Sequence, residues 1–280
     1  DGPSRNHDSA DRGGIERLAS KVISSLPDPQ AFDDFNPPDP PEQPRSPWSM
    51  MDLVVFGVFF GLTVLLLPAG VIQIWRIFNP ELHLSDLTAT DQVLLQGVMN
   101  LVIVGFIAFL VKVVHRQSFL ATIHWFKNHQ FGTGFLISLG ATLAVSVLIV
   151  SSFFPSGEPP PIERLLKSTT AIYVFALFGI AVAPLFEEII FRGFLFKVLD
   201  DTRGHGTAVS ATAILFALLH LPQLWGSWAG VALIFVVGYI LSFIRQRSNS
   251  LIPSFIIHTS YNTMLFGVFA LSSLVQKGGR

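Results

Sequence analysis

Long apolar runs separated by short polar segments dominate the chain from residue 50 onward. A helix needs about 20 mostly apolar residues to cross the hydrocarbon core of a bilayer. Measured against that length, the pattern predicts about seven spanning helices. They are expected near residues 50–74, 92–114, 132–154, 170–198, 207–224, 228–245 and 251–275. The predicted fold class is therefore all-α, a polytopic bundle of transmembrane helices.

Two segments break this pattern. Residues 1–48 are rich in Pro, Asp and Ser, and bury too little apolar surface to offset the entropy of ordering. This tail is expected to be largely disordered, with a short surface helix over 15–26. A Pro-rich connection at 155–169 follows the third predicted span. The expected organisation is the tail, then N-terminal transmembrane helices over 49–165, then a helical core over 166–275 that holds the functional residues.

Lys and Arg concentrate in alternate loops of the predicted bundle. The loops after the second, fourth and sixth spans carry most of them: Lys112, Arg116, Lys127, Lys197, Arg203, Arg245 and Arg247. Positively charged loops stay in the cytoplasm, so the N-terminus is expected on the cytoplasmic side of an inner or plasma membrane. Arg245 and Arg247 are interpreted as topology determinants.

Composition supports an integral membrane protein and narrows its chemistry. The chain is 13% charged, against about 25% for soluble domains. Its net charge of -1 gives no reason to expect a nucleic-acid partner. It has no cysteine, which excludes thiolate nucleophiles and cysteine-ligated metals.

The fourth predicted span contains three ionisable side chains, Glu187, Glu188 and Arg192, in an otherwise apolar stretch. Charges within a membrane cost about 2.5–3.5 kcal/mol each on insertion scales, so they mark functional sites by default. Glu188 and Arg192 are four residues apart and are expected to pair on one helix face. Adjacent helical residues point about 100° apart, so Glu187 faces elsewhere. Without a sequence-local partner, Glu187 suits general-base work on water.

Two more apolar helices carry polar side chains at helical spacing. Phe216 and His220 are four residues apart, and so are His258 and Asn262, so each pair shares a helix face. Taken alone, His220 is better explained by packing or hydrogen bonding than by catalysis. His258 and Asn262 could equally join helices through hydrogen bonds. The combination of all three motifs is far more specific than any one of them.

Together the three motifs resemble those of the CPBP intramembrane proteases (CAAX protease and bacteriocin-processing family, also called Abi). The matching segments are Glu187-Glu188-Ile-Ile-Phe-Arg192, Phe216-Ala-Leu-Leu-His220 and His258-Thr-Ser-Tyr-Asn262. The resemblance covers about residues 170–270. It implies an endopeptidase that hydrolyses peptide bonds within the membrane, with its site on helices four, five and seven. The implied substrate is a membrane-associated or lipidated, CAAX-type protein or peptide.

The resemblance also implies roles for the motif residues. Glu187 and His220 would activate the attacking water. His258 and Asn262 would stabilise the oxyanion. The two remaining motif residues would support and shape the site: Glu188 and Arg192.

The sequence leaves zinc-dependent and metal-free hydrolysis both open. Two histidines and a glutamate form a sound catalytic zinc set with water in the fourth position, and Glu187, His220 and His258 are the candidate ligands. Against zinc, no His-Glu-x-x-His motif occurs. A Glu/His pair that polarises water needs only residues already in view.

Two other classes of function use similar residues. A non-proteolytic, bacteriocin-immunity-type protein would share the same fold. A proton-coupled transporter would use Glu, His and Arg as a relay, and it is expected to show repeats in both halves of the chain. Here the polar residues gather in the C-terminal half. The favoured interpretation is therefore a protease whose partners are the lipid bilayer and a peptide or lipidated substrate.

Overall fold

The chain forms helices, as the apolar pattern predicts. The computed structural model describes residues 9–25, 47–81, 83, 86–127, 130–154, 173–174 and 176–278. Within these ranges every regular element is a helix, and none is a strand. The predicted all-α class is confirmed.

The chain divides into two compact units, Asp1–Arg45 and Ser46–Arg280. The first unit contains α1 (Ser9–Ser25), which corresponds to the expected surface helix but begins earlier. The rest of the Pro-rich tail, up to residue 46, and the Pro-rich connection at 155–169 lie outside the described residues.

The helices of the second unit follow the predicted spans. The first three spans correspond to α3 (Met50–Arg76), α4 (Ala89–Phe109) with the π-helical η2 (Leu110–Val114), and α6 (Thr133–Ser152), with the short α5 (Phe119–Thr122) before α6. The fourth is a succession of η3 (Phe178–Val182), α9 (Ala183–Glu188), η4 (Ile189–Leu195) and α10 (Phe196–Arg203). The last three are α11 (His205–Leu219), α12 (Trp228–Ser248) and α13 (Leu251–Gly278).

The fifth helix is shorter than expected. Its pattern predicts a helix to residue 224, but α11 ends at Leu219 with His220 as its C-cap. Pro222 explains the difference, because a proline disfavours helical geometry in the residue that precedes it. The early end leaves His220 at a helix terminus.

Four described helices are long and apolar enough to cross a membrane. They are Met50–Arg76, Thr90–Val114, Thr133–Ser152 and Trp228–Ser248. The apolar His205–Leu219 is shorter than these. The structure thus supports a membrane protein, while the cytoplasmic N-terminus stays a prediction.

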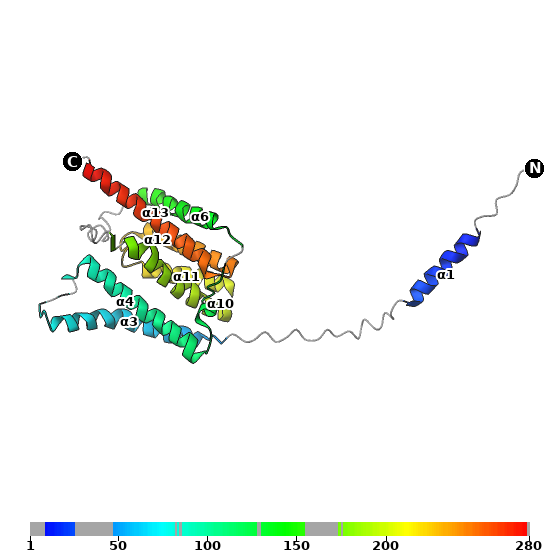
Figure 1. Ribbon diagram of the computed structural model, residues 1–280, viewed down its shortest axis with the longest axis horizontal. Coiled ribbons are helices and arrows are strands. Elements are labelled where there is room, and N and C mark those ends of the chain that lie inside the picture. The colour runs from blue at the N-terminus through cyan, green and yellow to red at the C-terminus, as the bar shows by residue number, and fades with distance from the viewer. Residues whose placement is uncertain are drawn as a thin grey trace, which may run out of the picture. The chain divides into compact units, whose positions relative to one another are not determined.

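The arrangement of the second unit places η4 at its centre. α3 packs along α4, and α6 packs along α13, with α11 and α12 between these two pairs (Figure 1). A buried core joins α3, α4, η4 and α11 through side chains that include Phe56, Ile107, Phe194 and Phe216. All seven residues of η4 are buried. The segment that follows the two glutamates is therefore enclosed by protein.

α6 and α13 approach closely at Gly140. A Cβ atom on this residue would lie 2.4 Å from the carbonyl oxygen of Ile257 and 2.7 Å from the Cβ of Ser260. Small residues at helix crossings allow such close backbone approach within membranes. This contact holds α6 against α13 at Ile257, the residue that precedes His258.

Candidate active site

Glu187 and Glu188 end a short α-helix between two π-helical segments. α9 has six residues, with η3 before it and η4 after it. Pro184 lies in its first turn and removes one backbone donor. π-helical turns occur frequently at functional sites. The two neighbouring acids differ in exposure, since the Glu187 side chain is 28% exposed and that of Glu188 is fully buried.

The expected pair of Glu188 and Arg192 is present in the interior. Arg192 donates from Nη1 to Glu188 Oε1 at 3.0 Å, and both side chains are fully buried. Arg192 also donates from Nη2 to the carbonyl oxygen of Gly238 at 3.0 Å and from Nε to Ser242 Oγ at 3.3 Å. Its guanidinium lies 4.4 Å from the ring centroid of Phe216, a cation–π contact. Arg192 thereby joins η4 to α12 and α11.

His258 lies between the two carboxylates. Its Nδ1 atom is 2.9 Å from Glu188 Oε1, and since an ionised carboxylate only accepts, Nδ1 donates this bond. Its Nε2 atom is 3.6 Å from Glu187 Oε2, which is longer than a hydrogen bond. Glu188 thus orients the His258 ring, and the ring presents its Nε2 atom to Glu187.

His220 is held by the backbone of its own helix. Its Nδ1 atom is 2.8 Å from the carbonyl oxygen of Phe216, so Nδ1 donates and Nε2 keeps a free lone pair. The ring of Phe216 lies between the two histidines, with centroids 4.6 Å from that of His220 and 5.8 Å from that of His258. Among the described contacts, none joins His220 directly to Glu187 or His258.

Asn262 contacts the helix that leads into the site. Its Nδ2 atom donates to the carbonyl oxygen of Gly179 in η3 at 2.7 Å. The other amide hydrogen of Asn262 and its Oδ1 atom take part in none of the described hydrogen bonds. The structure therefore places Glu187 and Glu188 on either side of His258, and it places Asn262 against the preceding π-helical segment.

The three candidate zinc ligands are not gathered around one point. Within the described part of the chain, no three His, Cys, Asp or Glu side chains form a group that could hold a metal ion. Glu187 and His258 face each other, whereas no described contact joins His220 to either of them. The arrangement does not fit a zinc site with these three protein ligands.

Sequence reasoning missed the polar face of α12. Arg245 is 2% exposed and donates from Nε to the carbonyl oxygen of Arg192 at 3.1 Å, so it supports the site in the interior, beyond its interpretation as a topology determinant. Ser242 Oγ lies 3.0 Å from Thr212 Oγ1 of α11. The signal was present in the sequence, because Gly238, Ser242 and Arg245 have the spacing of one helix face.

Comparisons with known proteins point to the same region. Residues 169–264 match a family model described as Type II CAAX prenyl endopeptidase Rce1-like. Every motif residue named above falls in this interval, and the resemblance inferred from the motifs is confirmed there. The chain is also 27% identical over 155 residues to the UPF0177 protein YxdF of Lactococcus lactis subsp. lactis (strain IL1403). That alignment spans 55% of this chain and 80% of the relative. No solved structure matches the chain.

Proposed function

We propose, from the Rce1-like match and the cluster around His258, that this protein is an intramembrane endopeptidase. The observation that carries the proposal is the position of His258, with Nδ1 2.9 Å from Glu188 and Nε2 3.6 Å from Glu187. A buried acid that orients an imidazole beside a second, partly exposed acid is an arrangement suited to hydrolysis. The family match points to the substrate class, a membrane-associated or prenylated CAAX-type peptide.

Glu187 is proposed to activate the attacking water. Its carboxylate is the partly exposed one of the two, so water can reach it, whereas Glu188 is enclosed and paired with Arg192. The water oxygen attacks the scissile carbonyl carbon while Glu187 accepts one of its protons. The free Nε2 lone pair of His220 is proposed to accept a hydrogen bond from the same water. Such general-base assistance contributes about 10²–10⁴-fold to a rate.

His258 and Asn262 are proposed to stabilise the tetrahedral oxyanion. His258 acts in its imidazolium form, with Nδ1–H on Glu188 and Nε2–H directed to the oxyanion, and the second donor is the remaining amide hydrogen of Asn262. Donors fixed in a dry site are worth about 3–4 kcal/mol each in other hydrolases. When the intermediate collapses, the C–N bond breaks and the proton held by Glu187 passes to the leaving amine. The products are a new carboxylic acid, which keeps the second proton of the water, and a free amine, and Glu187 returns to its starting state.

The decisive experiment measures peptide cleavage by the full chain in lipid nanodiscs. The probe is a farnesylated CAAX-type peptide with a fluorophore and a quencher on either side of the expected cleavage point. Glu187→Gln is expected to lower the cleavage rate by about 100-fold or more, and His220→Gln by a similar factor. Thr263→Ala is the matched control, because this polar residue follows Asn262 but is exposed. Cleavage by Glu187→Gln at the original rate would overturn the proposal.

The same assay tests metal dependence. Because the three candidate donors are not gathered, cleavage is expected to persist after zinc is removed by a chelator and its absence is verified by elemental mass spectrometry. Loss of cleavage that added zinc restores, and that other divalent ions do not, would show that these donors assemble around zinc in the working enzyme.

A further inference from the structure

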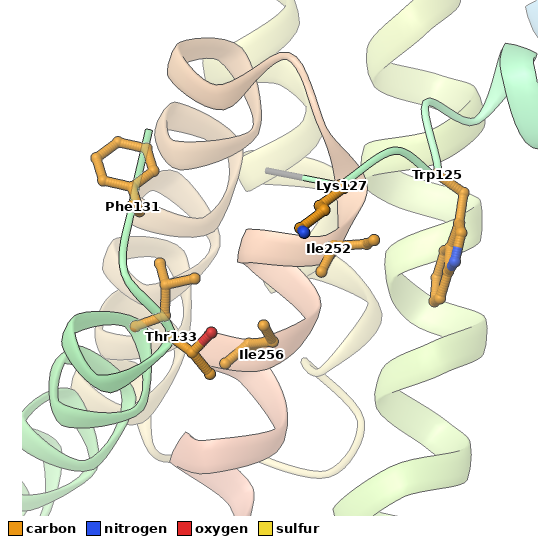
Figure 2. Close-up of a pocket in the computed structure, with 7 residues that line it drawn as sticks. Trp125, Lys127, Phe131, Thr133, Ile252 and Ile256 are labelled. Atoms are coloured by element: carbon orange, nitrogen blue, oxygen red, sulfur yellow. The ribbon is translucent and has the colours of Figure 1, made fainter. Parts of the chain in front are cut away.

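A cavity lies at the end of the bundle where the connection after α5 meets α6 and α13 (Figure 2). Its volume is about 310 Å³, at the small end of the range of ligand pockets, about 300–1,000 Å³. The lining residues are Trp125, Lys127, Phe131, Thr133, Leu136, Ile252 and Ile256. None of them belongs to the candidate active site.

Lys127 is the one charged residue in this lining. In Figure 2 its side chain reaches over Ile252, with Phe131 and Thr133 to one side and Trp125 to the other. The Lys127 ammonium makes no ion pair with any described residue. The remaining walls are mostly apolar. A cation with no ion-pair partner among the described residues, beside an apolar wall, is complementary to an anion that carries a hydrocarbon chain.

The cavity lies where a bilayer lipid can reach it. Trp125 lies in the connection between the spanning helices Thr90–Val114 and Thr133–Ser152, and aromatic residues outside the ends of spans mark the membrane interface. Next to the cavity, α6 exposes Phe135 and Ile137, which are 54% and 49% exposed, as expected for a lipid-facing helix. The phosphate level and the hydrocarbon region of the bilayer therefore both adjoin this opening.

The cavity walls are held together by hydrogen bonds between the connection and the start of α13. The backbone N–H of Leu251 donates to the carbonyl oxygen of His124 at 2.9 Å. Ser250 Oγ donates to the carbonyl oxygen of Phe126 at 2.6 Å. The site is therefore formed before any ligand binds, which lowers the cost of binding.

We propose that this cavity binds an anionic phospholipid of the surrounding bilayer. The lipid phosphate lies at the Lys127 ammonium and the Thr133 hydroxyl, and part of one acyl chain lies against the half-buried Ile252 and Ile256. The proposal does not depend on the proposed function, since it concerns a different part of the bundle.

Thermal unfolding of the full chain in a neutral detergent tests the proposal. Short-chain phosphatidylglycerol is expected to raise the unfolding temperature in a saturable way, because a ligand that binds only the folded state stabilises it. Phosphatidylcholine of the same chain length and inorganic phosphate are the comparison ligands. Neither is expected to produce a comparable shift. An equal response to phosphatidylcholine, or a full response to inorganic phosphate alone, would overturn the assignment.

Two variants localise the binding. Lys127→Ala is expected to weaken the apparent affinity for phosphatidylglycerol about fivefold, the value of one lysine near an anionic headgroup. Lys112→Ala is the matched control, since Lys112 is exposed on η2 and lies outside the lining. Ile256→Trp fills the apolar part and is expected to reduce binding although Lys127 is retained. Unchanged affinity in Lys127→Ala would contradict the proposal whatever the other variant does.

Discussion

Arg245 on α12 donates its Nε–H to the backbone carbonyl oxygen of Arg192 in η4, at a distance of 3.1 Å. Both arginines are buried, with exposures of 2% and 0%. The Arg245 guanidinium also lies 5.1 Å from the ring centroid of Phe196, within cation–π distance. One arginine thus supports the backbone of the other, and α12 stabilises the π-helical segment that follows the glutamates.

Arg245→Lys is expected to lower the stability of the fold by about 2 kcal/mol, the cost of losing a hydrogen bond from a charged donor. A lysine has a single charged nitrogen and cannot reproduce the planar guanidinium at this position. The measurement is thermal unfolding in detergent, followed by tryptophan fluorescence. Arg247→Lys, two residues away and exposed, is the control. Equal losses of stability in the two variants would show that the hydrogen bond from Arg245 to the Arg192 carbonyl does not stabilise the fold.

Glu188→Gln is expected to destabilise the protein by about 3–5 kcal/mol, because it leaves the buried charge of Arg192 without its partner. It should also lower cleavage, since it removes the acceptor that orients His258. Glu187→Gln is expected to lower the cleavage rate by about 100-fold or more while keeping the unfolding temperature close to that of the parent chain.

A double variant separates charge from packing at this pair. Glu188→Leu with Arg192→Met removes both charges, and replacing a buried ion pair by apolar side chains is often neutral for stability. We therefore expect the double variant to be more stable than Glu188→Gln. A double variant that is less stable than the single one would mean that the Arg192 bonds to Gly238 and Ser242 dominate.

Gly140→Ala is expected to cost about 1–3 kcal/mol, the usual effect of forcing extra atoms into a packed interior. The added Cβ would lie 2.4 Å from the Ile257 carbonyl oxygen, so α6 and α13 must separate. Gly105→Ala on α4 is the control, because a Cβ there meets no atom within 4 Å. The unfolding temperatures of the two variants, measured under the same conditions, test this prediction. Equal stability of Gly140→Ala and Gly105→Ala would contradict the close approach of α6 and α13.

His124 predicts a pH dependence of stability. It lies in the connection between α5 and α6, and burial together with the nearby charge of Arg245 lowers the pKa of His124 from 6.5 to about 4. Between these values the unfolded chain binds a proton that the folded protein does not bind. The contribution of His124 to the free energy of unfolding is therefore complete above pH 6.5, and it is lost as the pH falls toward 4.

The variant His124→Asn isolates this contribution. Asparagine accepts the positive φ of 55° at this position and keeps an amide donor for the carbonyl oxygen of Asn249. Unfolding temperatures measured between pH 7 and pH 4.5 should fall less steeply in this variant than in the parent chain. The same substitution at His83, an exposed histidine before α4, is the matched control. Identical slopes in the parent and His124→Asn would refute the prediction.

The helical bundle could be predicted because membrane spans are defined by length and apolarity, and both are read directly from sequence. The pairing of Glu188 with Arg192 could be predicted for a similar reason, since it depends only on helical spacing. The early end of α11 was harder to predict, because the apolar run continues to Leu221 and only Pro222 indicates where the helix ends.

The rest of the site depends on contacts between distant segments. His258 could be named a functional residue from its motif, but its place between two carboxylates follows from how α13 crosses α9. The bond from Asn262 to the Gly179 carbonyl oxygen likewise joins residues 83 positions apart. Arg245 resembled an ordinary cation at a span end, and only the packing of α12 against η4 shows its buried role.

The two π-helical segments around α9 have a consequence for how the chain tolerates insertions and deletions. Each π-helical turn holds one more residue than an α-helical turn. It therefore sets the rotation, about the helix axis, of all the residues that come after it in the helix. Deleting one residue from η4 would turn the later part of the helix by about 100°. A deletion at the end of α10, at Arg203, would shift only an exposed position beside a loop. A scan of single deletions should therefore find a narrow intolerant window, centred on the turns that flank Glu187 and Glu188.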